Sequence, residues 1–321
     1  MGGLAQVLVL GLISGSIYAL FALGVVLIHR GTGVLTFGGG EVGTAAIFLA
    51  AFLVDGGVIR LPVLPDIDLP GMPWAVGALG AITLAVGIGL LFERLVVRPM
   101  VGRDPVSVSV ATVGLGLFLL SLEFRLFGES PQQLAGPVDA GFTVAGVIVS
   151  PTQVVGLVLA LALGFGLQAA LRRTDFGLGI LAAAQDPDAV RLVGVPLARI
   201  SMTIWAAGAA LAGVAALLVA PTVGAFGPGY ASELYVIGLA AAVVGGLNSL
   251  PGAVVGGVAL GIATSAGTRW LSGLDLPGLQ YLIVLAVLLL VLLGRQTLPD
   301  LLRRLEPPTP QPAPTPTEAR A

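Results

Sequence analysis

The sequence of 321 residues contains no cysteine and no lysine, and its single histidine is His29. The absence of cysteine excludes disulfides and thiolate metal sites, and a lone histidine excludes paired-histidine metal chemistry. A Walker A loop needs its lysine to reach the phosphates of a nucleotide, so this chain supplies no ordinary P-loop. If ATP drives the protein, another subunit binds the ATP.

Charge is also scarce. Only 10% of the residues are charged, 56% are hydrophobic, and the mean hydropathy is +1.03. A soluble domain of this length needs far more charge to keep its surface in water. The net charge of −2, without a basic tract, argues against nucleic acid as a partner. The composition therefore predicts an integral membrane protein.

The hydrophobic residues form long continuous runs, each close to the roughly 20 residues that span a bilayer as a helix. Membrane barrels instead show short alternating segments. We therefore predict an all-α polytopic bundle of eight or nine transmembrane helices. The expected spans lie near residues 4–28, 35–54, 74–97, 105–127, 146–171, 200–220, 231–247, 251–271 and 279–294. The first lacks a basic segment before it and is interpreted as a retained helix rather than a signal peptide.

The glycine, proline and charged residues between the apolar runs predict one domain followed by a tail. Residues 1–304 form the transmembrane domain, with polar loops at residues 55–73 and 128–141 and a long cytoplasmic loop at about residues 172–199. Residues 305–321 are rich in proline and threonine and are expected to form a disordered cytoplasmic tail.

Arginine residues indicate the orientation. They gather after the third, fifth and last expected spans, as Arg94, Arg98, Arg103, Arg172, Arg173, Arg191, Arg199, Arg295, Arg303 and Arg304. The loops that carry Asp55, Asp66, Asp68, Glu129 and Asp139 have little positive charge. The positive-inside rule places the arginine clusters in the cytoplasm, so nine spans put the N-terminus outside and the C-terminus inside.

The segment Thr36-Phe37-Gly38-Gly39-Gly40-Glu41 interrupts the second span. Each glycine makes a regular helix less favourable by about 1 kcal/mol relative to alanine. Such a segment is tolerated at membrane depth where it faces protein or a water-filled cavity, and an intramembrane carboxylate needs a partner or a cavity. Two compatible interpretations stay open: a broken helix that lines a translocation path, or a carboxylate that caps the following helix near the cytoplasmic interface.

Small residues and outer charges give two further hypotheses. Gly252 and Gly256, and Gly257 and Gly261, are pairs four residues apart, a spacing that favours close helix packing. Glu123 and Arg125 sit near the outer end of the fourth span, where side chains are expected to reach toward the interface.

The cytoplasmic loop contains a candidate docking segment for a soluble partner. A short amphipathic helix can start at Asp186 and end at Gly194. Its pattern, Asp188-Ala189-Val190 followed three residues later by Gly194, resembles the EAA-x-x-x-G loop with which ABC importer permeases engage their ATPases. The residues assigned to this coupling are Asp186, Asp188, Ala189, Arg191, Leu192, Val193 and Gly194.

Blocks spread over the chain resemble the branched-chain amino acid permease family of ABC importers. They are GSIYALFALGVVLI, the Gly40-Glu41 pair, RRTDFGLGILAAAQDPDAVRLVGV and GGLNSLPGAVVGGVALG. The resemblance implies an all-α fold of inverted repeats in the cell membrane and no catalytic activity of its own. It also implies a second homologous permease, two cytoplasmic ATPase subunits and an extracytoplasmic solute-binding protein as partners. Substrates in the family are leucine, isoleucine and valine, with relatives that carry other amino acids, urea or short amides.

The chain departs from the family at the broken span. The family commonly has Asn-Phe-Ala-His-Gly-Glu where this chain has Thr36 to Glu41, so the asparagine and the histidine are lost. If this segment touches substrate, the substrate differs from a branched-chain amino acid. If it only shapes the path, the binding protein sets specificity.

The sequence gives weaker support to two other function classes. A secondary transporter would want ionisable groups deep in several spans, and Glu41 is the one convincing candidate in the sequence, although an ATP-independent facilitator stays open. A membrane-embedded enzyme would need a clustered acid–base or metal set, which the sequence does not display.

Overall fold

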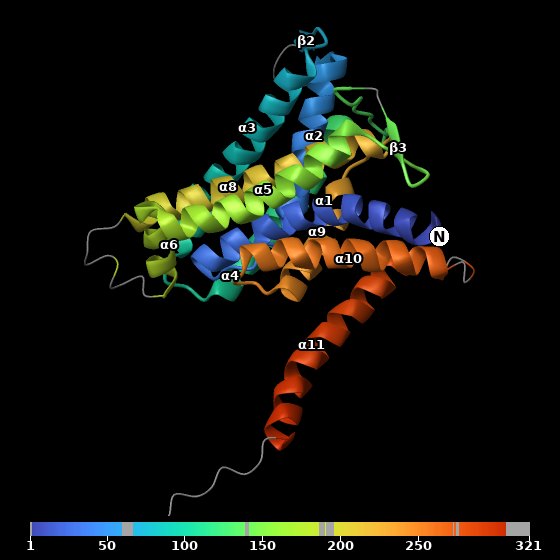
Figure 1. Cartoon of the computed structure of the whole chain (residues 1–321). Helices are drawn as coiled ribbons and strands as arrows, with labels where there is room; N and C mark the ends of the chain where they lie inside the picture. The colour runs from blue at the N-terminus through green and yellow to red at the C-terminus, as the bar shows by residue number, and fades with distance from the viewer. Residues whose placement is uncertain are drawn as a thin grey trace, which may run out of the picture.

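The protein folds as a bundle of long helices joined by short hairpins and turns, as Figure 1 shows. The computed structural model describes residues 2–59, 67–138, 141–185, 190, 196–271, 273 and 276–305. The helices are α1 Gly2–Thr32, α2 Gly39–Asp55, α3 Trp74–Phe92, α4 Pro105–Phe127, α5 Pro151–Arg173, α6 Asp175–Gln185, α8 Leu197–Val219, α9 Tyr230–Gly245, α10 Leu250–Trp270 and α11 Leu279–Leu305. A π-helical turn, η1 Glu93–Val97, and 3-10 turns, η2 Arg98–Met100 and η3 Ala220–Thr222, extend α3 and α8.

Local caps set several of these boundaries. The Ser150 side chain accepts a hydrogen bond from the Gln153 N–H and the Gln153 side chain accepts one from the Ser150 N–H, a capping box that starts α5. The expected start at residue 146 is therefore wrong, because residues 147–149 form a strand instead. Ser249 caps α10 and Asp104 caps α4 with the side chain alone, by accepting from the N–H groups of Gly252 and Val106, and each is followed by a proline within the first helical turn.

The predicted polytopic helical bundle is confirmed. Six described helical segments are long and apolar enough to cross a membrane, namely Gly3–Thr32, Trp74–Met100, Pro105–Phe127, Pro151–Arg173, Leu197–Thr222 and Leu250–Trp270. Tyr230–Gly245 and Leu279–Gly294 are shorter apolar helices, and α2 has 17 residues. Each of the nine expected spans thus corresponds to a helix, whereas the count of eight or nine complete crossings stays a prediction.

The predicted polar loop at residues 55–73 contains one hairpin, and a second hairpin follows the predicted loop at residues 128–141. β1 Gly57–Ile59 pairs antiparallel with β2 Ile67–Leu69 between α2 and α3, and β3 Phe142–Val144 pairs antiparallel with β4 Val147–Val149 ahead of α5. A further bridge between Gln132 and Phe226 ties the segment after α4 to the segment after η3.

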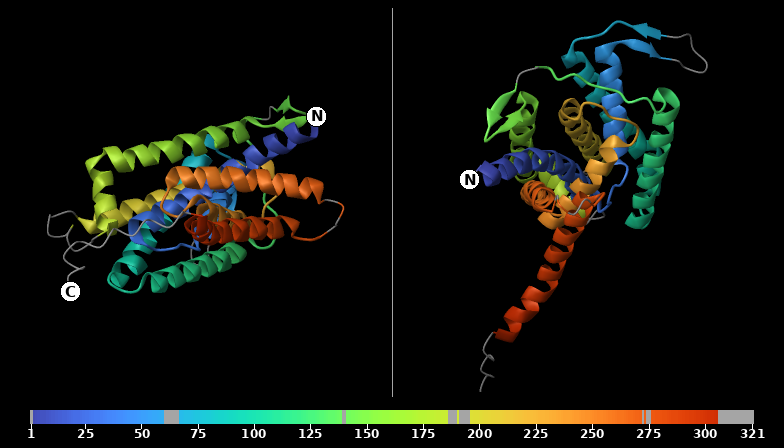
Figure 2. Two further views of the ribbon diagram at one scale, coloured as in Figure 1. Left: turned by 60° about the horizontal axis from the view of Figure 1, so that its bottom comes forward. Right: turned by 90° about the vertical axis from the view of Figure 1, so that its right-hand side faces the viewer.

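The packing of the helices repeats within the chain. α1 packs on α10, α9 and α8, while α8 packs on α3, α2 and α1; likewise, α2 packs against α3 as α9 packs against α10. α1 and α8 run in opposite directions in Figure 1, as two inverted repeats require. α1 lies at the centre, where its residues 19–23 are fully buried. Figure 2 shows α4 on one side of this core and α11 directed away from it.

Candidate functional site

Two helices of the bundle begin inside it, each after a short non-helical segment, which is called a break below. The first break follows α1, where Gly33 has a φ of 72° and residues 33–38 connect α1 to α2. The second follows η3, where residues 223–229 connect to α9 and Gly229 takes the left-handed conformation with a φ of 77°. At 1.5 Å per residue, α2 and α9 are about 26 Å and 24 Å long, shorter than the roughly 30 Å of a hydrocarbon core.

The N-terminal ends of α2 and α9 meet. The Ser232 hydroxyl donates to the Glu41 carboxylate over 2.7 Å, and the Thr44 hydroxyl accepts from the Ala231 N–H over 3.1 Å. These contacts bring together residues almost two hundred positions apart in the sequence. The bundle therefore contains two short helices whose positive dipole ends converge, an arrangement that transporters use around polar substrates.

The three glycines of the predicted broken segment lie at this meeting point. Gly38 precedes α2, and Gly39 and Gly40 form its first turn. A methyl group on Gly40 would overlap the Cα of Ser232, and one on Gly39 would overlap the ring of Tyr235. The glycines are thus needed for close approach to α9, in addition to interrupting the helix.

The first two residues of the segment take different environments. The Thr36 side chain is buried, and its carbonyl accepts a hydrogen bond from the Tyr235 hydroxyl over 3.0 Å. Phe37 is 43% exposed and points out of the single chain. The ring of Tyr235 lies against Gly39.

Glu41 lies in the first turn of α2 and is 7% exposed. It lies at the meeting point of α2 and α9, where its carboxylate accepts from Ser232. α2 has no side-chain cap hydrogen bond at its N-terminus. A broken helix that lines a path and a carboxylate that caps α2 near the cytoplasmic interface both stay predictions for this residue.

Helix α4 supplies polar groups to both breaks. The Ser109 and Thr112 hydroxyls accept from the backbone N–H groups of Leu35 and Phe37, over 3.2 and 2.9 Å. Further along the same helix, the Glu123 carboxylate accepts from the N–H of Gly229 over 3.1 Å. These bonds satisfy backbone donors that the broken helices leave without partners.

Sequence reasoning missed the role of Glu123. Its side chain is 2% exposed and faces Glu41 inside the bundle, so the expectation that it reaches toward the outer interface is wrong. A signal was present: Thr112, Gly116, Leu119 and Glu123 recur every three or four residues and form the buried face of α4. That periodicity separates Glu123 from the exposed Arg125 beside it.

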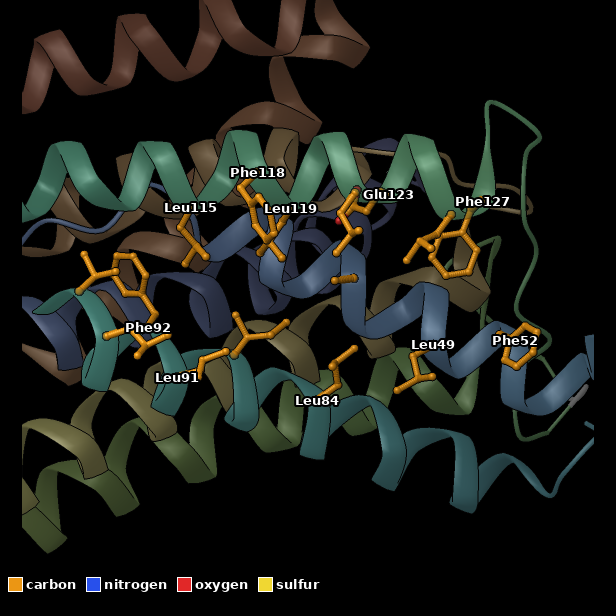
Figure 3. Close-up of a pocket in the computed structure, with 16 residues that line it drawn as sticks. Leu49, Phe52, Leu84, Leu91, Phe92, Leu115, Phe118, Leu119, Glu123 and Phe127 are labelled. Atoms are coloured by element: carbon orange, nitrogen blue, oxygen red, sulfur yellow. The ribbon is translucent and has the colours of Figure 1, made fainter. Parts of the chain in front are cut away.

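A cavity of about 820 Å³ lies between α3 and α4, with α2 at its base. Its lining consists of aliphatic and aromatic side chains together with Glu123, which in Figure 3 projects from α4 toward α2. The cavity thus reaches the Glu41–Glu123 contact from the side of the bundle.

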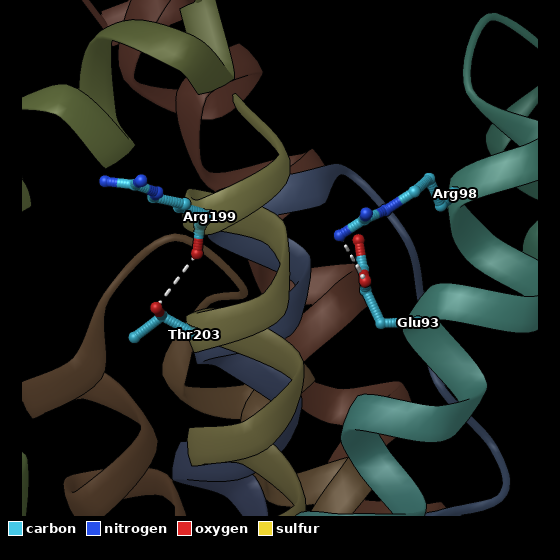
Figure 4. A network of polar contacts seen from close by, with 4 residues as sticks. All are labelled: Glu93, Arg98, Arg199 and Thr203. Atoms are coloured by element: carbon cyan, nitrogen blue, oxygen red, sulfur yellow. Dashed lines mark hydrogen bonds and ion pairs between the residues drawn. The ribbon is translucent and has the colours of Figure 1, made fainter. Parts of the chain in front are cut away.

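The opposite end of the bundle from the hairpins carries an ion pair between a buried glutamate and a partly exposed arginine. Glu93 is 1% exposed and accepts a hydrogen bond from the Arg98 guanidinium over 3.2 Å, as Figure 4 shows. Across from it, the Thr203 hydroxyl donates to the Arg199 carbonyl at the start of α8. A cavity of about 700 Å³ is lined by Glu93 and Arg98, by residues of α6 and by the first turn of α8.

The residues assigned to ATPase coupling lie outside the described residues. Asp186, Asp188, Ala189, Arg191, Leu192, Val193 and Gly194 belong to this group. Between them, the described Val190 is buried. α6 forms before this segment, in a stretch that the sequence had not indicated as helical. The proposed tail beyond residue 305 also lies outside the described part of the chain.

The spaced glycines on α10 make close backbone contacts. A side chain on Gly252 or Gly256 would meet backbone atoms of α9, and one on Gly257 or Gly261 would meet backbone atoms of α1. The two pairs therefore face different neighbours, and α10 fits between α1 and α9.

Comparison with known proteins identifies the family of the chain. Residues 7–292 match the sequence model of the family described as branched-chain amino acid transport system / permease component. The chain belongs to this family. The high-affinity branched-chain amino acid transport system permease protein BraD of Pseudomonas aeruginosa is 30% identical over 301 residues, which cover 91% of this chain and 94% of BraD.

Other relatives and one solved structure are similar over most of the chain. The permease protein LivH of Salmonella typhimurium is 27% identical over 89% of this chain and 94% of its own length. A probable LivH of Methanocaldococcus jannaschii is 28% identical over 81% of this chain and 80% of its own length. The structure of PsaBC from Streptococcus pneumoniae in complex with Fab is similar over 89% of this chain and 91% of that chain, with 14% identity and a TM-score of 0.45.

Family membership and the apolar helices together define the class of the protein. It is a multi-pass membrane protein and the permease subunit of an ABC importer, not an enzyme. A permease of this kind works with further subunits that bind solute and hydrolyse ATP.

Proposed function

We propose that this permease imports aliphatic branched-chain amino acids, or a closely related small polar solute. It works beside a second permease subunit, identical or homologous, with two cytoplasmic ATPase subunits and an extracytoplasmic solute-binding protein. The substrate assignment is supported by BraD and LivH, whose names describe branched-chain amino acid transport, and by the length over which this chain matches them.

The proposed path passes the meeting point of α2 and α9. The observation that carries this proposal is the convergence of two helix N-termini at Glu41 and Ser232, inside the bundle. The segment from Thr36 to Glu41 would shape the path, and the exposed Phe37 would face the second permease subunit across it. Binding of solute between the N-terminal ends of α2 and α9 suits alternating access, because discontinuous helices of this kind move as units around a fixed site.

The proposed orientation places the ion pair of Glu93 and Arg98 on the cytoplasmic side and the two hairpins outside. It rests on the arginine distribution and puts the N-terminus outside and the C-terminus inside. The segment Asp186 to Gly194 would then contact the ATPase, because it connects α6 and α8 at the cytoplasmic end. Closure of the ATPase dimer would move this segment and rock the helices that flank it.

Uptake into proteoliposomes tests the proposal. The permease is reconstituted with its partner permease and ATPases, and leucine uptake is measured with the binding protein outside and ATP inside. We expect uptake that requires ATP and that isoleucine and valine inhibit by competition. Uptake by the permease alone without ATP would instead indicate a facilitator.

A helix-breaking insertion tests the predicted coupling segment. A proline inserted between Ala189 and Val193 breaks a short helix and should weaken copurification of the ATPases, together with uptake. The matched control is a proline inserted in residues 310–315, outside the predicted coupling segment. Normal ATPase binding and uptake by the first variant would contradict the coupling assignment.

A further inference from the structure

Three glutamates are buried among the described residues, and two of them face each other. Glu93 has the guanidinium of Arg98 as its partner. Glu41 and Glu123 are 7% and 2% exposed and come from α2 and α4. Both carboxyl groups lie beside Gly229: its N–H donates to Glu123, and a Cβ added to it would lie 3.7 Å from Glu41 Oε1. Two like charges this close in a medium of low dielectric constant repel strongly.

The hydrogen bonds of the pair leave one oxygen of each carboxyl without a donor. Glu41 Oε1 accepts from the Ser232 hydroxyl, and Glu123 Oε2 accepts from the Gly229 N–H. Glu41 Oε2 and Glu123 Oε1 are buried without a protein partner in the described part of the chain. Because an ionised carboxylate only accepts hydrogen bonds, two of them cannot satisfy each other, whereas one proton between them makes one group the donor.

The surrounding elements offer no described cation to the pair. α3 has no charged residue, and the one charged residue of α8 is Arg199, in its first turn. On α4, Arg125 is exposed and two residues from Glu123, a spacing that does not share a helix face. On α9, Glu233 is exposed and accepts a hydrogen bond from Tyr281.

The remaining titratable groups beside the meeting point are tyrosines. Tyr235 on α9 donates its hydroxyl to the Thr36 carbonyl, and Tyr18 on α1 and Tyr230 on α9 lie nearby. Tyrosine is neutral over the physiological range, so these groups supply no compensating charge.

We propose that Glu41 and Glu123 bind one proton between them and form a hydrogen-bonded acid pair. The proton comes from solvent and returns to it, so the site binds a proton without other chemistry. The pair joins α4 to the meeting point of α2 and α9, beside the cavity between α3 and α4. Loss of the proton would set two carboxylates against each other and loosen the contact of α4 with the second break.

Infrared spectroscopy of the purified full-length protein in lipid nanodiscs tests the inference. The C=O stretch of a protonated carboxylic acid is separate from the bands of carboxylates. At a pH of about 7, where exposed carboxyl groups are ionised, we expect a band equivalent to one protonated carboxyl per chain. The variants Glu41→Gln and Glu123→Gln should each lose this band, because an amide then donates to the remaining carboxylate.

Glu93→Gln is the matched control, because Glu93 is equally buried but has an arginine partner. This variant should keep the band. Thermal unfolding gives a second measurement: a proton held by the folded pair but not by the unfolded chain makes the pair's stabilisation fall as pH rises. This decrease of stability with rising pH should be present in wild type and absent in Glu123→Gln.

Two results would overturn the inference. The first is the absence of a protonated-carboxyl band in wild type, which decides the question even if a variant fails to fold. The second is a band that survives in both Glu41→Gln and Glu123→Gln. Either result would be independent of whether the chain transports amino acids.

Discussion

A single methyl group at Gly40 should push α2 and α9 apart. In Gly40→Ala the new Cβ would overlap the Cα and the hydroxyl oxygen of Ser232 in α9. Since the Cα belongs to the backbone, a rotamer change of the serine cannot remove the overlap, and α2 or α9 must move. Overpacking of this kind destabilises proteins by about 1–3 kcal/mol, and we expect the upper part of that range.

Helix propensity acts in the opposite direction and sets the net effect. Replacing a helical glycine by alanine gains up to about 1 kcal/mol. The net loss for Gly40→Ala is therefore about 2 kcal/mol. Gly114 in α4 is the matched control, because no atom beyond its own stretch of helix lies within 4 Å of the position of its added Cβ. Gly114→Ala should be neutral or more stable by up to about 1 kcal/mol.

The assay is thermal or denaturant unfolding of both variants in the same detergent, with leucine uptake measured in parallel. Gly40→Ala should unfold more easily than wild type and lose uptake, whereas Gly114→Ala should do neither. If Gly40→Ala proved as stable as Gly114→Ala, the close approach of α2 and α9 would be refuted.

Three further substitutions test the hydrogen bonds and the ion pair. Tyr235→Phe removes the buried bond to the Thr36 carbonyl and should reduce the free energy of unfolding by about 1 kcal/mol, measured by chemical unfolding; no change would mean that the bond is absent. Arg98→Ala leaves the Glu93 carboxylate buried without a partner and should destabilise the protein by about 2–3 kcal/mol. Adding Glu93→Gln to this variant should restore part of the lost stability. Additive effects of the two substitutions in a double-mutant cycle would contradict an interaction between Glu93 and Arg98. Ser150→Ala removes the capping box of α5 and should lower stability by about 1 kcal/mol, whereas an unchanged melting temperature would show that Pro151 alone fixes this start.

Hydrophobicity alone predicted most of the helices, because long apolar runs in a membrane have few alternatives to a helix. The errors lie where local hydrogen bonds decide. The expected start of α5 was too early, since the short apolar segment at residues 147–149 pairs as a strand before the Ser150 cap. α6 was missed because its 11 residues are too short for a membrane span and follow directly on the arginines that end α5.

The candidate site was predicted in part. Thr36 to Glu41 was recognised because glycines and a carboxylate are unusual within an apolar run. Its partners were not, since Glu123 and Ser232 approach Glu41 only after distant helices pack. Hydropathy measures each span by itself, whereas the helical periodicity of α4 held the information that Glu123 faces inward.

The absence of cysteine makes the central claim, a path at the meeting point of α2 and α9, directly measurable. The variant Ser232→Cys places a unique thiol there, and Gly114→Cys places one on the exposed face of α4. A charged thiol reagent reacts with a thiolate in water. In the reconstituted transporter, we predict that the thiol at position 232 is labelled during ATP hydrolysis and protected by excess leucine, while the thiol at position 114 is not labelled. Leucine uptake that proceeds without any labelling at position 232 would contradict the path.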